Sequence, residues 1–233
     1  MRARYRLYGQ PWTRAVGPMM VLEELGIDYE LIPVDLQGGE HRKEPFLNIN
    51  PAGFLPALIT PEGDSLHEAG AIMLYLAERH GGPDLVPLPQ ERERGRFLSL
   101  FFFLTNDIQP PTKRFFYPWR YTVSDDQANE VRAQARLAAA ERWEVLDQLL
   151  ASGSGPWHLG QRFSIADLQM ALWASYGFEE MDDIVEAYPA VRQVFKGVMA
   201  RPVSGALLQE QRRSLSEWRA QRKARKAEAA ERA

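Results

Sequence analysis

The chain has 233 residues, of which 45% are hydrophobic and 25% charged, and its formal net charge is −3. This composition is ordinary for a globular protein and gives no overall basic field that would indicate nucleic acid, while the absence of cysteine excludes disulfides, zinc-thiolate sites and a protein thiol nucleophile. No apolar run approaches the roughly 18 residues of a membrane span, and the first residues, MRARYRLYG, lack the apolar core of a secretory signal, so we expect a cytoplasmic protein with no membrane partner.

Residues 1–82 alternate strand and helix signals. Apolar positions at helical spacing predict a helix over 14–25, between strands predicted at 4–8 and 29–34. After a polar, irregular segment, Pro61 and Gly63 predict a tight turn between two further strands, and a helix follows; these elements span 57–60, 65–68 and 69–82. The order βαβ and then ββα predicts one small α/β domain.

The second half of the chain carries helical signals. Residues 83–90 are rich in proline and are expected to be a linker to an all-helical domain over 91–211. Helices are predicted at 91–108, 125–151, 164–177 and 190–201, with an interruption at the prolines of 109–122. Ser164 and Asp167 have the spacing of a helix capping box. Residues 212–233 carry eight Lys or Arg against three Glu, which predicts a basic tail, helical or mobile.

The usual catalytic motifs are missing from the sequence. Its four histidines are scattered, which predicts no metal site, and there is no nucleophile elbow, P-loop or dinucleotide fingerprint. What remains is a set of element ends: the first strand runs into YGQPWTRA, Pro56 opens a strand, and Glu68 joins a strand to a helix. Pro56 either marks a loop before an edge strand or, with a cis Leu55–Pro56 bond, shapes a turn for a ligand. Helix starts beside such a strand favour a short, acidic, peptide-like ligand.

Four segments of the chain, taken in order, resemble the cytosolic glutathione S-transferase family, and its bacterial-type members in particular. These segments are LEELGIDYELIPVDL, INPAGFLPAL, HEAGAIMLYLAERHG and RFSIADLQMA. The resemblance covers residues 4–210 and implies a thioredoxin-like N-terminal domain followed by an all-α C-terminal domain. It implies a cytoplasmic, homodimeric enzyme of detoxification that adds the thiolate of glutathione, its co-substrate, to a small apolar electrophile. Two alternatives stay open: a glutathione-dependent disulfide reductase or isomerase on the same site, and a non-enzymatic binding or scaffold protein.

The same resemblance implies how glutathione would be bound. Leu55 would pair through its N–H and C=O with the cysteinyl backbone, and Pro56 would be the cis-proline. Glu68 lies where the family holds the γ-glutamyl end, but Ala69 replaces the usual Ser or Thr, so one side-chain hydrogen bond is missing. Lys43 is preferred over His41 and Arg42 for the glycyl carboxylate.

Three residues are candidates for activating the sulfur. Thr13 lies where serine-type members carry their hydroxyl, Tyr8 where tyrosine-type members carry theirs, and Arg14 near the cysteine or asparagine of other classes. Thr13 could instead be a helix cap and Tyr8 a core residue at a strand end. We expect Thr13 to be the activator, with Arg14 second. The electrophile pocket is expected between the domains. Some of the aromatic residues within 101–107 and 114–121 are expected to line this apolar cleft or a dimer seam, and the alternative for this helical stripe is the core.

Overall fold

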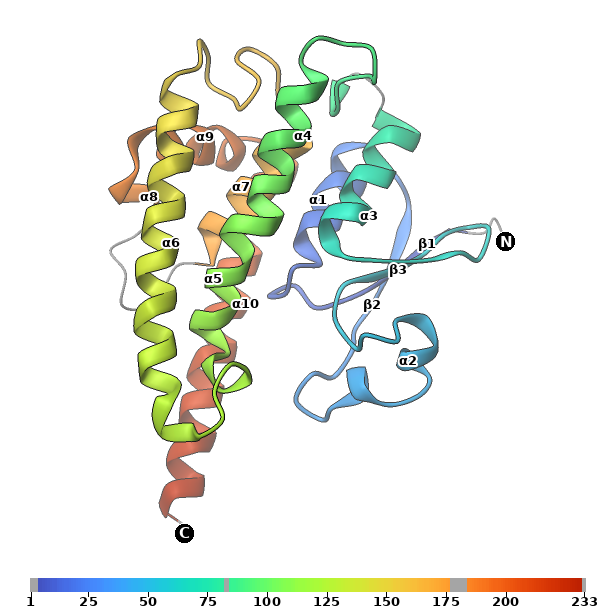
Figure 1. The fold of residues 1–233 in the computed structure, drawn as a ribbon. Coiled ribbons are helices and arrows are strands. Elements are labelled where there is room, and N and C mark those ends of the chain that lie inside the picture. The colour runs from blue at the N-terminus through green and yellow to red at the C-terminus, as the bar shows by residue number, and fades with distance from the viewer. Residues whose placement is uncertain (1–3, 82–83, 177–183, 232–233) are drawn as a thin grey trace. The chain divides into compact units, whose positions relative to one another are not determined.

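The structure, a computed structural model, describes residues 4–81, 84–176 and 184–231 (Figure 1). The chain forms two compact units. The first, which we call the α/β unit, combines Met1–His80 with Arg201–Ala233, and the second, the helical unit, is Gly81–Ala200. Each unit is described below by itself.

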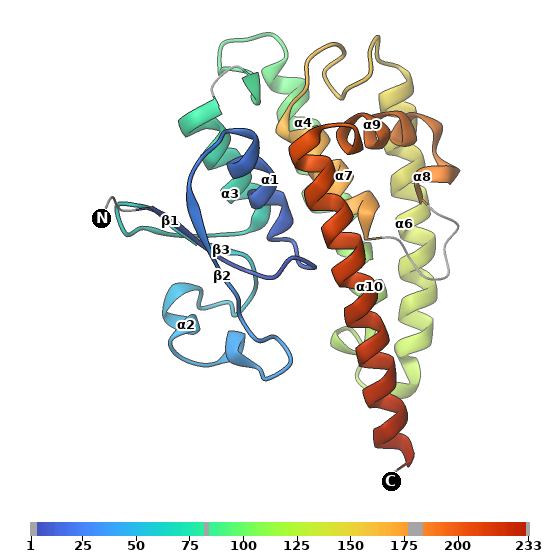
Figure 2. The same cartoon turned by 180° about the vertical axis from the view of Figure 1, so that it is seen from behind.

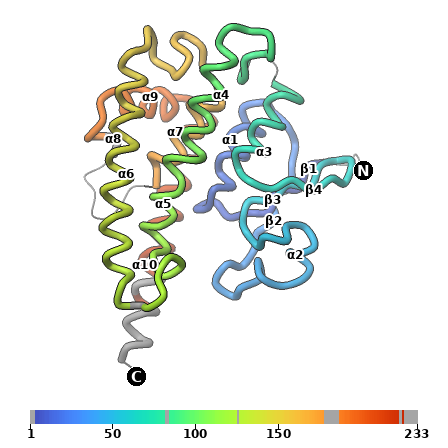
Figure 3. The backbone as a smooth tube through the Cα atoms, viewed as in Figure 1, coloured from blue at the N-terminus to red at the C-terminus, as the bar shows by residue number. Residues whose placement is uncertain are grey.

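A four-stranded mixed sheet forms the centre of the α/β unit (Figure 3). Its order is β2-β1-β3-β4, where the strands are β1 (Tyr5–Tyr8), β2 (Tyr29–Ile32), β3 (Ala57–Ile59) and β4 (Ser65–His67). Strand β1 runs parallel to β2 and antiparallel to β3, and β3 pairs with β4 as a hairpin. The predicted βαβ unit followed by a hairpin is confirmed, and it makes this unit thioredoxin-like.

Two helices of the α/β unit, α1 (Val16–Glu24) and α3 (Ala69–Leu76), pack against each other. Their apolar faces bury Met20, Leu22, Ile72 and Met73 completely. The polar segment after β2 is irregular, as expected, with a 3-10 turn at Glu40–Arg42 and a short helix α2 (Phe46–Ile49). The core is therefore formed by the sequence positions that showed helical spacing.

A long C-terminal helix, α10 (Pro202–Glu231), also belongs to the α/β unit and packs along α1 (Figure 2). The predicted boundary between a helical domain and a basic tail, at residues 211 and 212, lies inside α10. Leu208 and Leu215 are buried, and Trp218 stacks on Trp12 with ring centroids 4.8 Å apart. Together with the buried Gln211, these α10 residues follow one another at intervals of three or four positions. They therefore lie on one face of the helix, and this face is mostly apolar.

A polar contact joins the start of α10 to the end of α1. Glu24, whose side chain is 9% exposed, accepts hydrogen bonds from Arg201 Nε at 3.0 Å and from Ser204 Oγ at 2.6 Å. Burial alone raises the pKa of Glu24, but the hydrogen bonds from Arg201 and Ser204 outweigh it and hold that pKa below its usual value. The contact therefore stabilises the folded protein while Glu24 is ionised.

We expect Glu24→Gln to lower the free energy of unfolding by about 1.5–3 kcal/mol at neutral pH, the range of one hydrogen bond to a charged group. Because the folded-state pKa is depressed, this contribution is present above the unfolded pKa and is lost as pH falls through the folded pKa. Urea unfolding from neutral to acidic pH should show the difference between wild type and Glu24→Gln shrinking as pH falls. The exposed neighbour Glu23→Gln is the control. A difference that stays constant with pH would contradict this assignment.

The helical unit is built from helices that bury apolar residues between them. Within its described residues, strand-like pairing is limited to two isolated bridges, Trp157 with Gly160 and Leu159 with Arg162. The longer helices are α4 (Arg94–Phe103), α5 (Gln109–Phe116), α6 (Ala128–Ala151), α7 (Ile165–Ser175) and α9 (Pro189–Met199), and a short one is α8 (Ile184–Ala187). Every residue of α7 is buried, which makes it the central helix of this unit. No helix among the described residues has both the length and the apolar character that a membrane crossing requires.

The predicted interruption at Pro110 and Pro111 is wrong. The chain stays helical from α4 through a π-helical turn, Leu104–Ile108, into α5, where both prolines lie in the first turn. A proline is tolerated there because the first N–H groups of a helix have no intrahelical partner, and the wider turn separates the prolines from the preceding helix. The helix ends instead at Phe116, shortly before Pro118.

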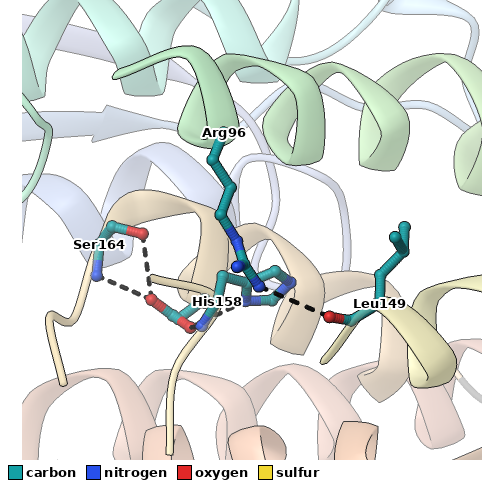
Figure 4. Close-up of polar contacts among 5 residues, drawn as sticks. Arg96, Leu149, His158 and Ser164 are labelled. Carbon is teal, nitrogen blue, oxygen red and sulfur yellow. Dashed lines mark hydrogen bonds and ion pairs between the residues drawn. The ribbon is translucent and has the colours of Figure 1, made fainter. Parts of the chain in front are cut away.

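The predicted capping box at the start of α7 is confirmed (Figure 4). The buried carboxylate of Asp167 accepts hydrogen bonds from the Ser164 N–H at 2.8 Å and the Ser164 hydroxyl at 3.1 Å. It also accepts from the N–H of His158 at 2.9 Å and from His158 Nδ1 at 2.8 Å. Nearby, Arg96 on α4 donates to the carbonyl oxygen of Leu149 near the end of α6. Asp167 thus links the preceding loop to the central helix.

Candidate functional site

Three element ends meet at one end of the sheet in the α/β unit. Tyr8, the last residue of β1, pairs with Ala57, the first residue of β3, and Ala57 pairs with His67, the last residue of β4. The turn after β1, the Leu55–Pro56 segment before β3 and Glu68 after β4 therefore lie next to one another.

The Leu55–Pro56 peptide bond is cis, as the resemblance implied. Leu55 is buried in a small cluster with Val34, Phe46 and Ala57. Its carbonyl oxygen accepts a hydrogen bond from Arg14 Nη2 at 3.1 Å, and its N–H donates to no group in the described part of the chain. Since a carbonyl oxygen has two lone pairs, Leu55 keeps both a donor and an acceptor for a ligand backbone.

Arg14 is the most unusual side chain of this region. It is 15% exposed, and its Nη1 lies 3.7 Å from the Glu68 carboxylate, too far for a hydrogen bond. Nη1 is buried and has no hydrogen-bond acceptor among the described residues. A buried guanidinium N–H without an acceptor is costly, and this nitrogen keeps the capacity to donate one further hydrogen bond.

The hydroxyl of Thr13 is occupied by the turn itself. It donates to the carbonyl oxygen of Gln10 at 2.8 Å and accepts from the N–H groups of Gln10 at 3.2 Å and Ala15 at 3.3 Å. Thr13 is 8% exposed, and a Cβ at Gly9 would lie only 2.2 Å from the Ala15 Cβ, which shows how tightly the turn folds back. In this conformation the Thr13 hydroxyl donates within the turn, to the carbonyl oxygen of Gln10.

Tyr8 lies at the end of β1, where its half-buried ring meets the edge of Phe46 at 6.1 Å between centroids. Its ring packs against the cluster that contains Leu55. Its hydroxyl makes no hydrogen bond within the residues that the structure describes. Tyr8 is thus a packing residue of the strand end with a free hydroxyl.

Glu68 has a backbone conformation that sequence reasoning missed. At φ 70° and ψ 117° it is the one non-glycine residue with positive φ in the described chain. Such a conformation costs of order 1–3 kcal/mol and is common at ligand sites. It places Glu68, with a side chain 58% exposed, directly before α3, whose first residue is the buried Ala69. The N–H of Ala69 is at the start of the helix and is open to an anion.

Lys43 lies on the exposed segment before α2. Its Nζ donates to the carbonyl oxygen of Gly38 at 3.0 Å. The neighbouring Arg42 donates to the Ala52 carbonyl oxygen and covers the ring of Phe54 at 4.9 Å. The structure therefore groups Arg14, Leu55, Glu68 and Ala69 tightly and leaves Lys43 at the surface.

The aromatic segments of the helical unit divide between core and surface. Phe101 and Phe115 are buried, whereas Phe102, Trp119 and Tyr121 are 49%, 40% and 45% exposed. No group of three or more metal-ligating side chains occurs in the described residues.

Comparison with known proteins gives consistent matches for both halves of the chain. The family model described as "Glutathione S-transferase, N-terminal domain" matches residues 3–78, and "Glutathione S-transferase, C-terminal domain" matches residues 107–205. The disulfide-bond oxidoreductase YfcG of Escherichia coli (strain K12) is 33% identical over 219 residues, which cover 88% of this chain and 95% of the relative. A maleylacetoacetate isomerase of Pseudomonas aeruginosa is 31% identical over 182 residues, 76% of this chain and 82% of the relative. Among solved structures, a sphingomonad glutathione S-transferase complexed with glutathione is 29% identical, with a TM-score of 0.73 over 88% of this chain and 98% of that one.

Proposed function

Because the chain belongs to the cytosolic glutathione S-transferase family, we propose that it binds glutathione in the α/β unit and transfers the glutathione thiolate to a small electrophile with an apolar body. One observation carries this proposal: the buried Nη1 of Arg14, without an acceptor, lies beside the Leu55 backbone and the Glu68 carboxylate. An anionic sulfur at this position would accept the charge-assisted hydrogen bond that Nη1 lacks.

Glutathione would lie along the end of the sheet. Its cysteinyl backbone pairs with the N–H and C=O of Leu55, in the manner of a peptide added as a strand. The γ-glutamyl carboxylate meets the N–H of Ala69 at the start of α3, and Glu68 meets the γ-glutamyl ammonium. Lys43 would reach the glycyl carboxylate by leaving the carbonyl oxygen of Gly38, and Pro56 holds the Leu55 backbone in place.

Arg14 is our proposed activator, in place of Thr13. A free thiol has a pKa of about 8.5 and is mostly protonated at neutral pH, and a nearby guanidinium stabilises its thiolate. The thiolate then forms a bond to the electrophilic carbon, and the leaving group departs with the electron pair. Thr13 supports this step indirectly, because its three hydrogen bonds hold the turn from which Arg14 projects.

A glutathione-dependent disulfide reductase is the second candidate, and the similarity to the disulfide-bond oxidoreductase YfcG favours it. The bound thiolate would attack a disulfide, forming a mixed disulfide and releasing one thiol. A second glutathione would then displace the other thiol and leave as glutathione disulfide. These steps need no protein cysteine, and this chain has none.

Assays with glutathione against an aryl halide, a small disulfide and a maleyl compound distinguish transferase, reductase and isomerase activities. Calorimetric titration with glutathione tests the binding that all three share. Absence of binding at millimolar glutathione would rule out all three and leave a non-enzymatic protein with this fold. Light scattering tests the homodimer that the resemblance implies, and cell fractionation tests the proposed cytoplasmic location.

We expect Ala69→Ser to tighten glutathione binding by about 0.5–1.5 kcal/mol, because a hydroxyl at the start of α3 adds one hydrogen bond to the γ-glutamyl carboxylate. Calorimetry of wild type and variant measures the difference. Ala71→Ser, at an exposed position of the same turn, is the matched control and should change nothing. Equal affinities for wild type and Ala69→Ser would mean that the γ-glutamyl carboxylate is held elsewhere.

A further inference from the structure

A cavity of about 300 Å³ lies wholly within the α/β unit. Three segments line it: the turn after β1, the loop after β2 and the middle of α10. Its volume is at the lower end of the range for small-molecule sites. The lining residues that determine its chemistry are Trp12, Asp35, Glu217 and Trp218, with Gln10 and Gln37 beside them.

The charge of the cavity is negative. Asp35 and Glu217 contribute two carboxylates, and none of the lining residues is Lys, Arg or His. Asp35 is held in position because its Oδ1 accepts the N–H groups of Gln37 and Gly38, both at 2.9 Å. Glu217 makes no ion pair within the described residues, so its charge is available to a ligand. An anionic ligand would be repelled here.

The apolar wall of the cavity is a pair of indole rings. Trp12, from the turn after β1, and Trp218, from α10, stack with centroids 4.8 Å apart and planes 19° apart. Both rings are half-buried and both line the cavity. Indole faces attract cations, and a stacked pair beside carboxylates is a favourable surface for an ammonium group that carries apolar substituents.

We propose that this cavity binds a cationic group, an ammonium on a small aromatic or aliphatic body, and that this group belongs to the second substrate. The second part rests on the proposed function, because Gln10 and Trp12 are in the same turn as Arg14, the proposed thiolate ligand. A substrate anchored here would approach the thiolate with its apolar body. The sequence predicted a small apolar electrophile. The cavity indicates that this electrophile also carries a positively charged group.

Three probes with a common benzyl body test the charge preference: benzyltrimethylammonium, benzyl alcohol and benzylsulfonate. Calorimetry and tryptophan fluorescence of the full chain measure their binding. We expect the ammonium probe to bind about 10-fold more tightly than the alcohol, which corresponds to a partly desolvated cation–π contact, and the sulfonate to bind most weakly. Glu217→Gln should weaken the ammonium probe about 3-fold and leave the alcohol unchanged, since an exposed ion pair contributes little.

Controls separate this site from the glutathione site. Glu30→Gln removes an exposed carboxylate of the same unit that does not line the cavity, and should leave all three probes unchanged. Arg14→Leu should weaken the binding of glutathione and leave the binding of the ammonium probe unchanged. Glu217→Gln should weaken the binding of the ammonium probe and leave the binding of glutathione unchanged. Trp218→Leu should weaken the binding of the ammonium probe and reduce the change in tryptophan fluorescence that this binding causes.

The proposal is overturned if benzylsulfonate binds as tightly as the ammonium probe, or if Glu217→Gln has no larger effect than Glu30→Gln. Binding of the ammonium probe without any binding of glutathione would leave the cation site standing and refute the proposed function. Binding of glutathione without discrimination among the probes would refute the cation site and leave the proposed function standing.

Discussion

Arg14→Leu should lower kcat/KM for glutathione by about 10- to 100-fold and raise the pKa of the bound thiol. The Arg14 side chain is 15% exposed and donates to the carbonyl oxygen of Leu55, and its buried Nη1 has no acceptor among the described residues. A hydrogen bond from a charged donor to a thiolate contributes about 1.5–3 kcal/mol, and each 1.4 kcal/mol changes a rate about tenfold. The ultraviolet absorbance of the bound thiolate as a function of pH gives the pKa, and initial rates give kcat/KM.

Three further variants test whether Arg14 acts through its charge. Arg14→Lys keeps the charge but loses the planar guanidinium, whose Nη2 donates to Leu55, so we expect an intermediate thiol pKa and rate. Thr13→Val should reduce stability through the turn and move the thiol pKa less than Arg14→Leu does. Tyr8→Phe should leave the thiol pKa unchanged. If Thr13→Val or Tyr8→Phe shifts the pKa and the rate while Arg14→Leu alters neither, the activator is that residue and our assignment is wrong.

Asp167→Ala should lower the free energy of unfolding by about 3–5 kcal/mol, because it leaves buried donors without their acceptor. The carboxylate is completely buried and accepts four hydrogen bonds, two from Ser164 and two from His158. A loss of this size is a large fraction of the stability of a typical domain. Denaturant unfolding followed by circular dichroism measures it.

Ser164→Ala is the matched control for Asp167→Ala. It removes the cap hydroxyl but leaves the Ser164 N–H and both His158 hydrogen bonds to Asp167, so we expect a loss of only about 1 kcal/mol. Asp167→Asn, which keeps the volume but replaces one acceptor oxygen by a donor, should lie between the two. An Asp167→Ala protein as stable as wild type would show that the network contributes nothing to stability.

Local patterns in the sequence predicted the α/β order, the hairpin, the helices and the capping box, because each depends on residues close together in the chain. The π-helical turn at Leu104–Ile108 was missed, since it depends on packing that removes the clash expected from Pro110 and Pro111. The stripe at Leu208, Leu215 and Trp218 was readable as helical spacing but was obscured by the basic residues around it.

At the candidate site, the sequence identified the residues but not their hydrogen bonds. Thr13 matched a known position, yet only the folded structure shows that its hydroxyl donates to the Gln10 carbonyl oxygen. The acceptor-free nitrogen of Arg14 and the positive φ of Glu68 depend on three segments meeting in space. No spacing rule for a single segment predicts either property.

The contact between Glu24 and Arg201 joins residues 177 positions apart. The helical unit is one continuous stretch of chain, whereas the α/β unit is formed from a first and a last segment. On a ribosome that adds roughly 5–20 residues per second, α1 therefore emerges many seconds before α10 is made. During that interval the face of α1 that receives α10 is uncovered, and the continuous unit can fold first. The part of the protein that is synthesised first is thus completed last.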